Sequence, residues 1–267
     1  MNALIKQNPR IIALVQARMG STRLPQKALM KILDKTLIEW IFYRLSFAKE
    51  INGIALSTSD TPENDILAEH ARNIGLQCFR GSETALIKRH LEAARMYNAD
   101  AIVRITGDNP LVDPAIVDKL VKFFKDNDTT DLVTNVFPPT FPDGMDIEVM
   151  SIRTLERLDK EFQNALDREW FIAAMMEKKD AFSILNLSYK DNLVGLRLTV
   201  DYPEDLALVE KIFSKLHREN EVFHLEDMLS LFKREPTLLS INKKWVDTTL
   251  INNSRLKTFY ELKKNTH

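Results

Sequence analysis

Strand-like segments alternate with helix-like segments along the first half of the chain. The strand-like segments are Ile11–Val15, which is fully apolar, and Gly53–Ser59, Leu76–Phe79, Ala101–Thr106 and Asp131–Val136. Segments with helical spacing and helix-start signals lie between them, beginning at Thr36, Thr61-Pro62, about Glu83 and Asp113-Pro114. Strands that alternate with helices form parallel βαβ units. The pattern therefore predicts an α/β fold with a mostly parallel, Rossmann-like sheet flanked by helices.

The rhythm changes after Phe137, where three prolines lie within five residues. The later segments predict two strands and three helices, at Asp146–Met150, Arg168–Lys178, Leu196–Val200, Glu204–Leu216 and Leu225–Phe232. We find no repeat and no linker. We therefore predict a single domain over residues 1–267, with an inserted subdomain over about 137–195. The last ~30 residues carry no clear pattern.

Composition and charge exclude several classes of protein. The formal net charge is −1, which excludes a general polyanion binder but not a local anion site. One cysteine and five scattered histidines exclude an internal disulfide and a zinc-ligand pattern. The apolar run at Ile11–Val15 is too short for a signal peptide, and no run approaches the ~20 residues of a membrane span. We expect a cytoplasmic protein that binds neither membranes nor nucleic acid.

The loop after the first predicted strand carries cations, hydroxyls and a glycine. It includes Arg18, Gly20, Ser21, Arg23 and Lys27, and no acidic residue precedes Asp34 in the chain. Gly20 allows a close backbone approach, and the three cations can neutralise phosphate oxygens. Ligands of open α/β sheets bind at the carboxyl ends of strands, where this loop lies. The residues therefore favour a phosphate site over the alternative of a basic surface loop.

Two aspartates each follow a predicted buried strand. Asp108 lies in Gly-Asp-Asn-Pro after Thr106, and Asp201 lies in Asp-Tyr-Pro-Glu-Asp after Val200. Magnesium takes one or two protein carboxylates and completes its shell with water and phosphate oxygens. Taken singly, Asp108 suits a turn and Asp201 suits a helix cap. Together with the cationic loop, the two predict a Mg²⁺ site.

Small polar groups at other strand ends suit a nucleotide or an acceptor. Thr58 ends the second predicted strand, and Arg80 and Ser82 flank Gly81 after the third. These segments suit a base or ribose, although helix capping by Ser59, Thr61 and Ser82 explains them equally well. Asp146 and Glu148 alternate along one strand and share a face, so they indicate either a polar ligand or a solvated edge.

The loop and the two aspartate segments resemble the cytidylyltransferases that make CMP-activated sugar acids, the CMP-Kdo and CMP-nonulosonate synthetases. Within that family, the chain is most similar to the branch named for spore-coat polysaccharide biosynthesis. The matching segments are Gln16-Ala17-Arg18-Met19-Gly20-Ser21-Thr22-Arg23-Leu24-Pro25-x-Lys27, Arg80-Gly81-Ser82-Glu83, Gly107-Asp108-x-Pro110, the Asp146–Val149 strand, Asp167-Arg168-Glu169 and Val200-Asp201-x-Pro203-Glu204-Asp205. The family usually has glycine where this chain has Gln26, acidic residues at Ala85–Lys88, and other residues at Trp170–Ile172.

The resemblance implies a fold of the nucleotide-diphospho-sugar transferase type, a Mg²⁺ cofactor and a role in surface-polysaccharide synthesis. The implied reaction transfers CMP from CTP to a small acidic acceptor with release of pyrophosphate. The implied site assigns Arg18, Arg23, Lys27 and Asp108 to catalysis, Asp108 and Asp201 to the metal, and Gln16, Ala17, Gly20, Ser21, Thr58, Arg80, Ser82, Thr106 and Gly107 to the nucleotide. The acceptor side would hold Asp146, Glu148, Arg168 and Glu169, and the inserted subdomain would form a homodimer.

Two alternatives stay open from the sequence. A glycosyltransferase of related architecture would use a nucleotide sugar and often an Asp-x-Asp motif. The one such triplet, Asp126-Asn127-Asp128, follows a predicted helix and suits a solvated turn. A non-catalytic nucleotide-binding protein would be consistent with the departures at Gln26 and Trp170.

Overall fold

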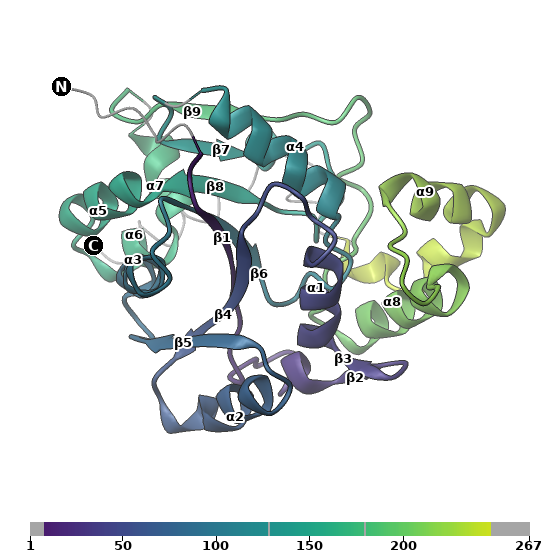
Figure 1. Cartoon of the computed structure of the whole chain (residues 1–267). Coiled ribbons are helices and arrows are strands. Elements are labelled where there is room, and N and C mark those ends of the chain that lie inside the picture. The colour runs from purple at the N-terminus through teal and green to yellow at the C-terminus, as the bar shows by residue number, and fades with distance from the viewer. Residues whose placement is uncertain (1–7, 128, 179, 247–267) are drawn as a thin grey trace.

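A seven-stranded mixed sheet forms the centre of the molecule in the computed structural model, which describes residues 8–127, 129–178 and 180–246 (Figure 1). The strand order is β5-β4-β1-β6-β8-β7-β9, and β2 and β3 form a separate hairpin. The strands are β1 (Ile11–Gln16), β2 (Lys31–Ile32), β3 (Lys35–Thr36), β4 (Gly53–Ser59), β5 (Gln77–Gly81), β6 (Ala101–Thr106), β7 (Leu132–Thr134), β8 (Glu148–Ser151) and β9 (Ile184–Asn186).

The parallel half of the sheet confirms the prediction. β1 lies between β4 and β6 and pairs with both in parallel, with Val15 opposite Leu56 and Ile105. All five residues from Ile11 to Val15 are buried, because helices cover both faces of the sheet. The carboxyl ends of these strands meet at one edge, and this edge carries the loop after Gln16 and the turn after Thr106.

Helices pack on both faces of the sheet. They are α1 (Leu37–Leu45), α2 (Asp65–Asn73), α3 (Leu86–Met96), α4 (Pro114–Lys125), α5 (Ile152–Glu161), α6 (Ala165–Glu169), α7 (Phe171–Glu177), α8 (Pro203–Leu216) and α9 (Leu225–Arg234). The short 3₁₀ helices are η1 (Lys27–Leu29), η2 (Pro62–Asn64), η3 (Pro236–Ser240) and η4 (Lys243–Trp245). One apolar core joins α1, α2, α4, α8 and α9 to the sheet, and a second joins α3, α5 and α7 to the opposite face (Figure 1). None of the helices in the described ranges is both long and apolar enough to span a bilayer.

Local signals predicted several helix starts correctly. The Thr36 side chain accepts a hydrogen bond from the Glu39 backbone N–H, and the Glu39 carboxylate accepts one from the Thr36 N–H. This capping box begins α1, as expected. Asp113 caps α4 ahead of Pro114. Asp126 follows the end of α4, whereas Asp128 of the Asp-x-Asp triplet lies outside the described residues.

The segment predicted as an inserted subdomain is built into the same sheet. β8 pairs antiparallel with both β6 and β7, and β9 pairs in parallel with β7. The prediction of different connectivity for residues 146–150 is confirmed. The single helix predicted at Arg168–Lys178 is instead two helices, α6 and α7, which meet at Trp170.

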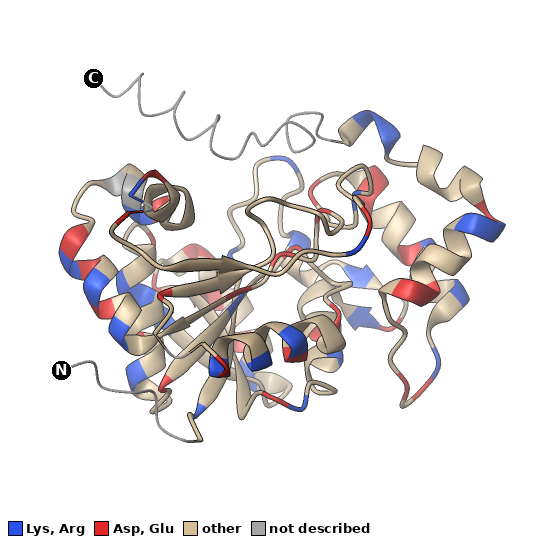
Figure 2. Ribbon diagram, turned by 90° about the horizontal axis from the view of Figure 1, so that it is seen from above, with Lys and Arg blue, Asp and Glu red and all other residues tan. Residues whose placement is uncertain are grey.

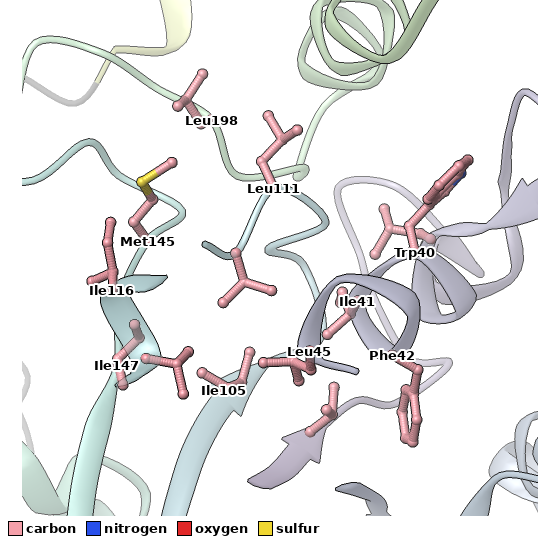
Figure 3. Packing of buried hydrophobic residues seen from close by; sticks show 14 of the residues in the cluster. Trp40, Ile41, Phe42, Leu45, Ile105, Leu111, Ile116, Met145, Ile147 and Leu198 are labelled. Carbon is pink, nitrogen blue, oxygen red and sulfur yellow. The ribbon is translucent and has the colours of Figure 1, made fainter. Parts of the chain in front are cut away.

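The predicted strand at Leu196–Val200 is wrong. In this segment, Arg197 forms an isolated bridge with Asp143, and none of the other residues belongs to a strand. Its backbone bonds to two loops instead, since the Leu198 N–H donates to Asp143 O and the Val200 N–H donates to Asp108 O. Leu198 still belongs to the same buried core as side chains of α1, β6 and α4 (Figure 3). The segment therefore delivers Asp201 next to the turn that carries Asp108.

Candidate active site

The loop after β1 forms one wall of a cavity of about 270 Å³. Buried Met19 anchors the loop, because its N–H donates to the buried Asn64 side chain at 2.8 Å. Gln26 adopts a left-handed φ of 58° just before η1, a conformation that glycine adopts more easily. The family that the loop resembles usually has glycine at this position. In this chain, Gln26 adopts the left-handed turn in place of glycine.

Most of the predicted nucleotide and metal residues line this cavity together. They are Gln16, Ala17, Arg18, Gly20, Ser21, Arg23, Lys27, Thr106, Gly107, Asp108 and Asp201. The cavity therefore combines cations from the loop with carboxylates from two other segments. Over the rest of the molecule, lysines and arginines are interspersed with carboxylates (Figure 2).

The Lys27 ammonium lies between the two carboxylates. Its Nζ is 3.0 Å from Asp108 Oδ2 and 2.8 Å from Asp201 Oδ1, and it also donates to Val200 O at 2.9 Å. Burial opposes the charge on Lys27, but Asp108 and Asp201 raise its pKa above the usual value. Burial likewise opposes ionisation of Asp108, but Lys27 and a hydrogen bond from Thr106 hold the pKa of this carboxyl below its usual value. Lys27 and Asp108 are therefore both charged at neutral pH.

Arg197 forms a second network, which contacts the Asp201 oxygen that Lys27 does not. Arg197 is 7% exposed and donates to Asp143 at 2.8 Å, to Asp201 at 2.9 Å and to Asp205 at 3.0 Å. The three carboxylates raise the pKa of Arg197, although burial alone would lower it. Asp205 also accepts from the backbone N–H groups of Asp201 and Tyr202. Its other oxygen accepts from Asn242 at 2.9 Å.

Gly107 allows the ends of β1 and β6 to touch. Its N–H donates to Gln16 O at 2.7 Å. A Cβ at position 107 would lie 2.5 Å from the Ala17 Cβ and 2.9 Å from Gln16 O, distances too short for real contacts. This close approach holds the turn with Asp108 against the cationic loop.

The donor set at the floor of the cavity fits a magnesium ion. Two carboxylate oxygens, from Asp108 and Asp201, lie within 3.0 Å of one nitrogen, so both face a common point. No cluster of three or more His, Cys, Asp or Glu residues suited to a metal occurs in the part of the chain that the structure describes. Mg²⁺ does not require such a cage, because phosphate oxygens and water complete its octahedron.

A second cavity, of about 210 Å³, adjoins the first. The two share Thr106, Asp108 and Asp201, and the second adds the predicted acceptor residues Asp146 and Glu148. Arg104 on β6 also lines it and donates to Glu148 at 3.0 Å and to Gln16 at 3.0 Å. A ligand in the second cavity would therefore meet a ligand of the first at Asp108 and Asp201.

Five predicted residues that the structure describes line neither cavity. Thr58 is fully buried in β4, and the Ser82 hydroxyl accepts from the Ala85 N–H, which is its capping alternative. Arg80 donates to Thr61 O and pairs with Asp65. On the acceptor side, Arg168 pairs with Asp159, and Glu169 is exposed. The prediction that Arg168 meets an acceptor carboxylate has no support in this placement.

Sequence reasoning missed Arg89, which lies on α3 and lines the first cavity. A basic residue within an amphipathic helix usually lies on the solvated face, so its sequence context gave no signal. In the structure, Arg89 is 4% exposed.

Comparison with known proteins shows similarity to cytidylyltransferases. A family model described as Cytidylyltransferase matches residues 12–169. A solved cytidylyltransferase from Leptospira borgpetersenii is 34% identical, with a TM-score of 0.82, over 86% of this chain and 97% of that one. The spore coat polysaccharide biosynthesis protein SpsF of Bacillus subtilis is 27% identical over 85% of this chain and 95% of its own length.

A 3-deoxy-manno-octulosonate cytidylyltransferase of Chlamydia trachomatis is 28% identical over 50% of this chain and 53% of its own length. The fold is accordingly the Rossmann-like α/β fold of nucleotidyltransferases, as predicted. The chain belongs to the cytidylyltransferase family, whose members are nucleotidyltransferases.

Proposed function

We propose that this protein is a magnesium-dependent cytidylyltransferase. It transfers CMP from CTP to a hydroxyl of a small acidic sugar or related metabolite, releases pyrophosphate, and acts in surface-polysaccharide biosynthesis. The observation that carries the proposal is the position of Asp108 and Asp201, which share the Lys27 ammonium where a cationic cavity meets an acidic one. The names of the Bacillus and Chlamydia relatives agree with the proposed pathway and donor.

The cationic wall is suited to the triphosphate. Arg18 and Arg23 have side chains that are more than half exposed at the mouth of the cavity, so both can reach a nucleotide without unfolding the loop. Phosphate oxygens accept strong hydrogen bonds from guanidinium and ammonium groups. These two arginines and Lys27 would neutralise the pyrophosphate as it leaves, so positioning and charge supply most of the catalysis.

Asp108 and Asp201 would hold Mg²⁺ against the triphosphate. When bound, the ion would neutralise charge at the α-phosphate and lower the pKa of the attacking hydroxyl. The low pKa of Asp108 keeps this carboxyl ionised and ready to bind a cation at neutral pH. Arg197 and Asp205 hold Asp201 from the side away from Lys27.

The second cavity would hold the acceptor. Glu148 and Asp146 can accept hydrogen bonds from sugar hydroxyls. Arg104 is the cation in its lining, so we assign to Arg104, and not to Arg168, the contact with an acceptor carboxylate. An acceptor hydroxyl placed beside Thr106 would lie next to the two carboxylates that would hold Mg²⁺.

A pyrophosphate-release screen tests the proposal. All four nucleoside triphosphates are tested with a panel of 2-keto sugar acids and neutral sugars, with Mg²⁺ or with EDTA. We expect release from CTP with at least one acceptor, dependent on Mg²⁺. Asp108→Ala should abolish turnover without unfolding the protein. Asp34→Ala, which removes an exposed carboxylate, should leave turnover unchanged. Near-normal turnover by Asp108→Ala would refute the metal assignment, and consumption of a nucleotide sugar instead of CTP would refute the reaction.

A homodimer through residues 137–195 and a cytoplasmic location stay predictions. Light scattering on the purified protein measures the mass directly, so a mass near that of one chain, 30.8 kDa, would contradict the homodimer.

A further inference from the structure

Arg89 is a buried guanidinium whose hydrogen bonds are incomplete. Nη1 donates to Ser82 O at 2.9 Å and, more weakly, to Glu83 O at 3.5 Å. Nε is buried and has no hydrogen-bond partner within the described residues. Arg89 also forms no ion pair with any residue in the described ranges. Arginine carries five N–H donors and no acceptor, so this side chain needs oxygen or nitrogen acceptors that the protein does not supply.

Burying such a charge with no carboxylate in direct contact is costly. Burial, and to a lesser degree the neighbouring Arg18 and Arg104, lower the pKa of Arg89 to about 10. The stem is nevertheless accommodated, because a Cβ on Gly81 would lie only 3.1 Å from Arg89 Cγ. The glycine at the end of β5 therefore makes room for an arginine that does not stabilise the protein by an ion pair. Such a group is typical of a binding site.

Arg89 and Lys27 both line the first cavity, but different charged groups act on them. The charged groups that act on Arg89 are Arg18, Arg104, Glu83 and Asp60. Those that act on Lys27 are Asp108 and Asp201. A nucleotide whose triphosphate lies between Arg23, Lys27 and the two aspartates would therefore extend its base toward the β5–α3 connection, where Arg89 is anchored by Ser82 O.

We propose that Arg89 reads the base of the nucleotide, donating two N–H groups to O2 and N3 of cytosine. This inference rests on the proposed function and names the residue that selects its donor. O2 and N3 of cytosine are adjacent acceptors, and they match the parallel donors of a guanidinium. Uracil carries a hydrogen on N3, so it would face Arg89 with a donor and leave that guanidinium N–H unpaired. Arg89 would therefore distinguish CTP from UTP.

Calorimetric titration of the full-length protein with CTP and with UTP tests this, in Mg²⁺ buffer without acceptor. We expect the wild type to prefer CTP. Arg89→Met should weaken CTP binding by about 10- to 100-fold, the effect of losing hydrogen bonds to a charged donor, and change UTP binding only a few-fold. Arg89→Lys, which keeps the charge but not the two parallel donors, should lose most of the preference.

Arg44→Met is the matched control. Arg44 is 1% exposed, and its guanidinium donates to Val112 O at 2.8 Å and Phe223 O at 2.7 Å, away from both cavities. This variant should lose stability but keep the wild-type CTP-to-UTP ratio. If Arg44→Met also loses the ratio, or if Arg89→Met weakens CTP and UTP equally, Arg89 does not read the base. Equal weakening of CTP and UTP binding would instead indicate that Arg89 contacts the triphosphate.

The outcomes distinguish a failure of base reading by Arg89 from a failure of the proposed cytidylyltransferase function. If the wild type binds no nucleotide, the proposed function fails. If the wild type binds CTP and the Arg89 variants keep its preference over UTP, only the inference fails. Circular dichroism checks the fold of each variant, and Arg89→Lys together with Arg89→Gln carries the test if Arg89→Met does not fold.

Discussion

Trp245 stacks face to face on Tyr202, with 3.6 Å between the ring centroids and 1° between the ring planes. Tyr202 directly follows Asp201, and the guanidinium of Arg23 lies 5.3 Å from the centre of the same ring. The Trp245 Nε1–H also donates to Glu204 at 2.8 Å. The last described segment of the chain thus packs on the residue next to a proposed metal ligand.

Trp245→Ala should lower the free energy of unfolding by about 1–2 kcal/mol, because it removes an aromatic pair and one hydrogen bond. It should also raise the Mg²⁺ concentration needed for half-maximal pyrophosphate release. Urea denaturation and a metal titration measure the two effects. Trp245→Phe keeps the stack and should recover most of the metal response. An unchanged metal requirement in Trp245→Ala would show that the stack does not position Asp201.

Gly107→Ala should destabilise the protein by about 1–3 kcal/mol, because the added Cβ forces the ends of β1 and β6 apart. The same movement would separate Asp108 from the cationic loop, so CTP turnover should fall as well. Gly195→Ala is the control, since a Cβ there would meet no atom within 4 Å. Thermal unfolding compares the two, and equal stabilities would contradict the close-packing account.

Lys27→Met should change metal and nucleotide binding in opposite directions. Without the ammonium, Asp108 and Asp201 repel each other and attract a divalent cation more strongly. Mn²⁺ should therefore bind more tightly in the absence of nucleotide, while CTP should bind about tenfold or more weakly. Electron paramagnetic resonance measures free Mn²⁺, and Lys35→Met, which loses a surface pair with Asp34, is the control. Parallel weakening of both ligands would contradict this role for Lys27.

The pair of Lys27 and Asp108 predicts an acid-sensitive contribution to stability. Folding lowers the pKa of Asp108 from 3.8, so its contribution is present above about pH 4 and is lost as the pH falls through the folded value. Folding raises the pKa of Lys27 from 10.5, so that contribution is lost only in strong base. Asp108→Asn should therefore be less stable than wild type by about 1–3 kcal/mol from pH 5 to 9, and the difference should shrink below pH 4. A difference that grows in acid would refute this account.

The sequence predicted the parts of the fold that depend on local pattern. Fully apolar runs such as Ile11–Val15 identified central parallel strands, because burial on both faces leaves no polar position. The same reasoning was wrong at Leu196–Val200. This segment alternates apolar with polar residues as a strand does, but its backbone hydrogen bonds go to the loops at Asp108 and Asp143, and nothing in its own residues reveals that.

The candidate site likewise has a part that the sequence predicted and a part that it did not. The cations of the loop and the two aspartates carry a recognisable chemistry at short spacing, so the sequence brought them together correctly. The support of Asp201 was not predictable, since Arg197, Asp143 and Asn242 are separated by tens of residues and meet only through the fold. Arg168 shows the converse, because a motif match placed it at the acceptor and Asp159 holds it elsewhere.

Asn242 bonds both Arg197 O and Asp205, so the support of Asp201 requires a residue that lies after every strand of the sheet. On the ribosome, a growing chain could already hold all its strands while this support was still inside the exit tunnel. The sheet and the loop after β1 would exist before Asp201 reached its final place. The candidate site would then be complete only after Asn242 had left the tunnel.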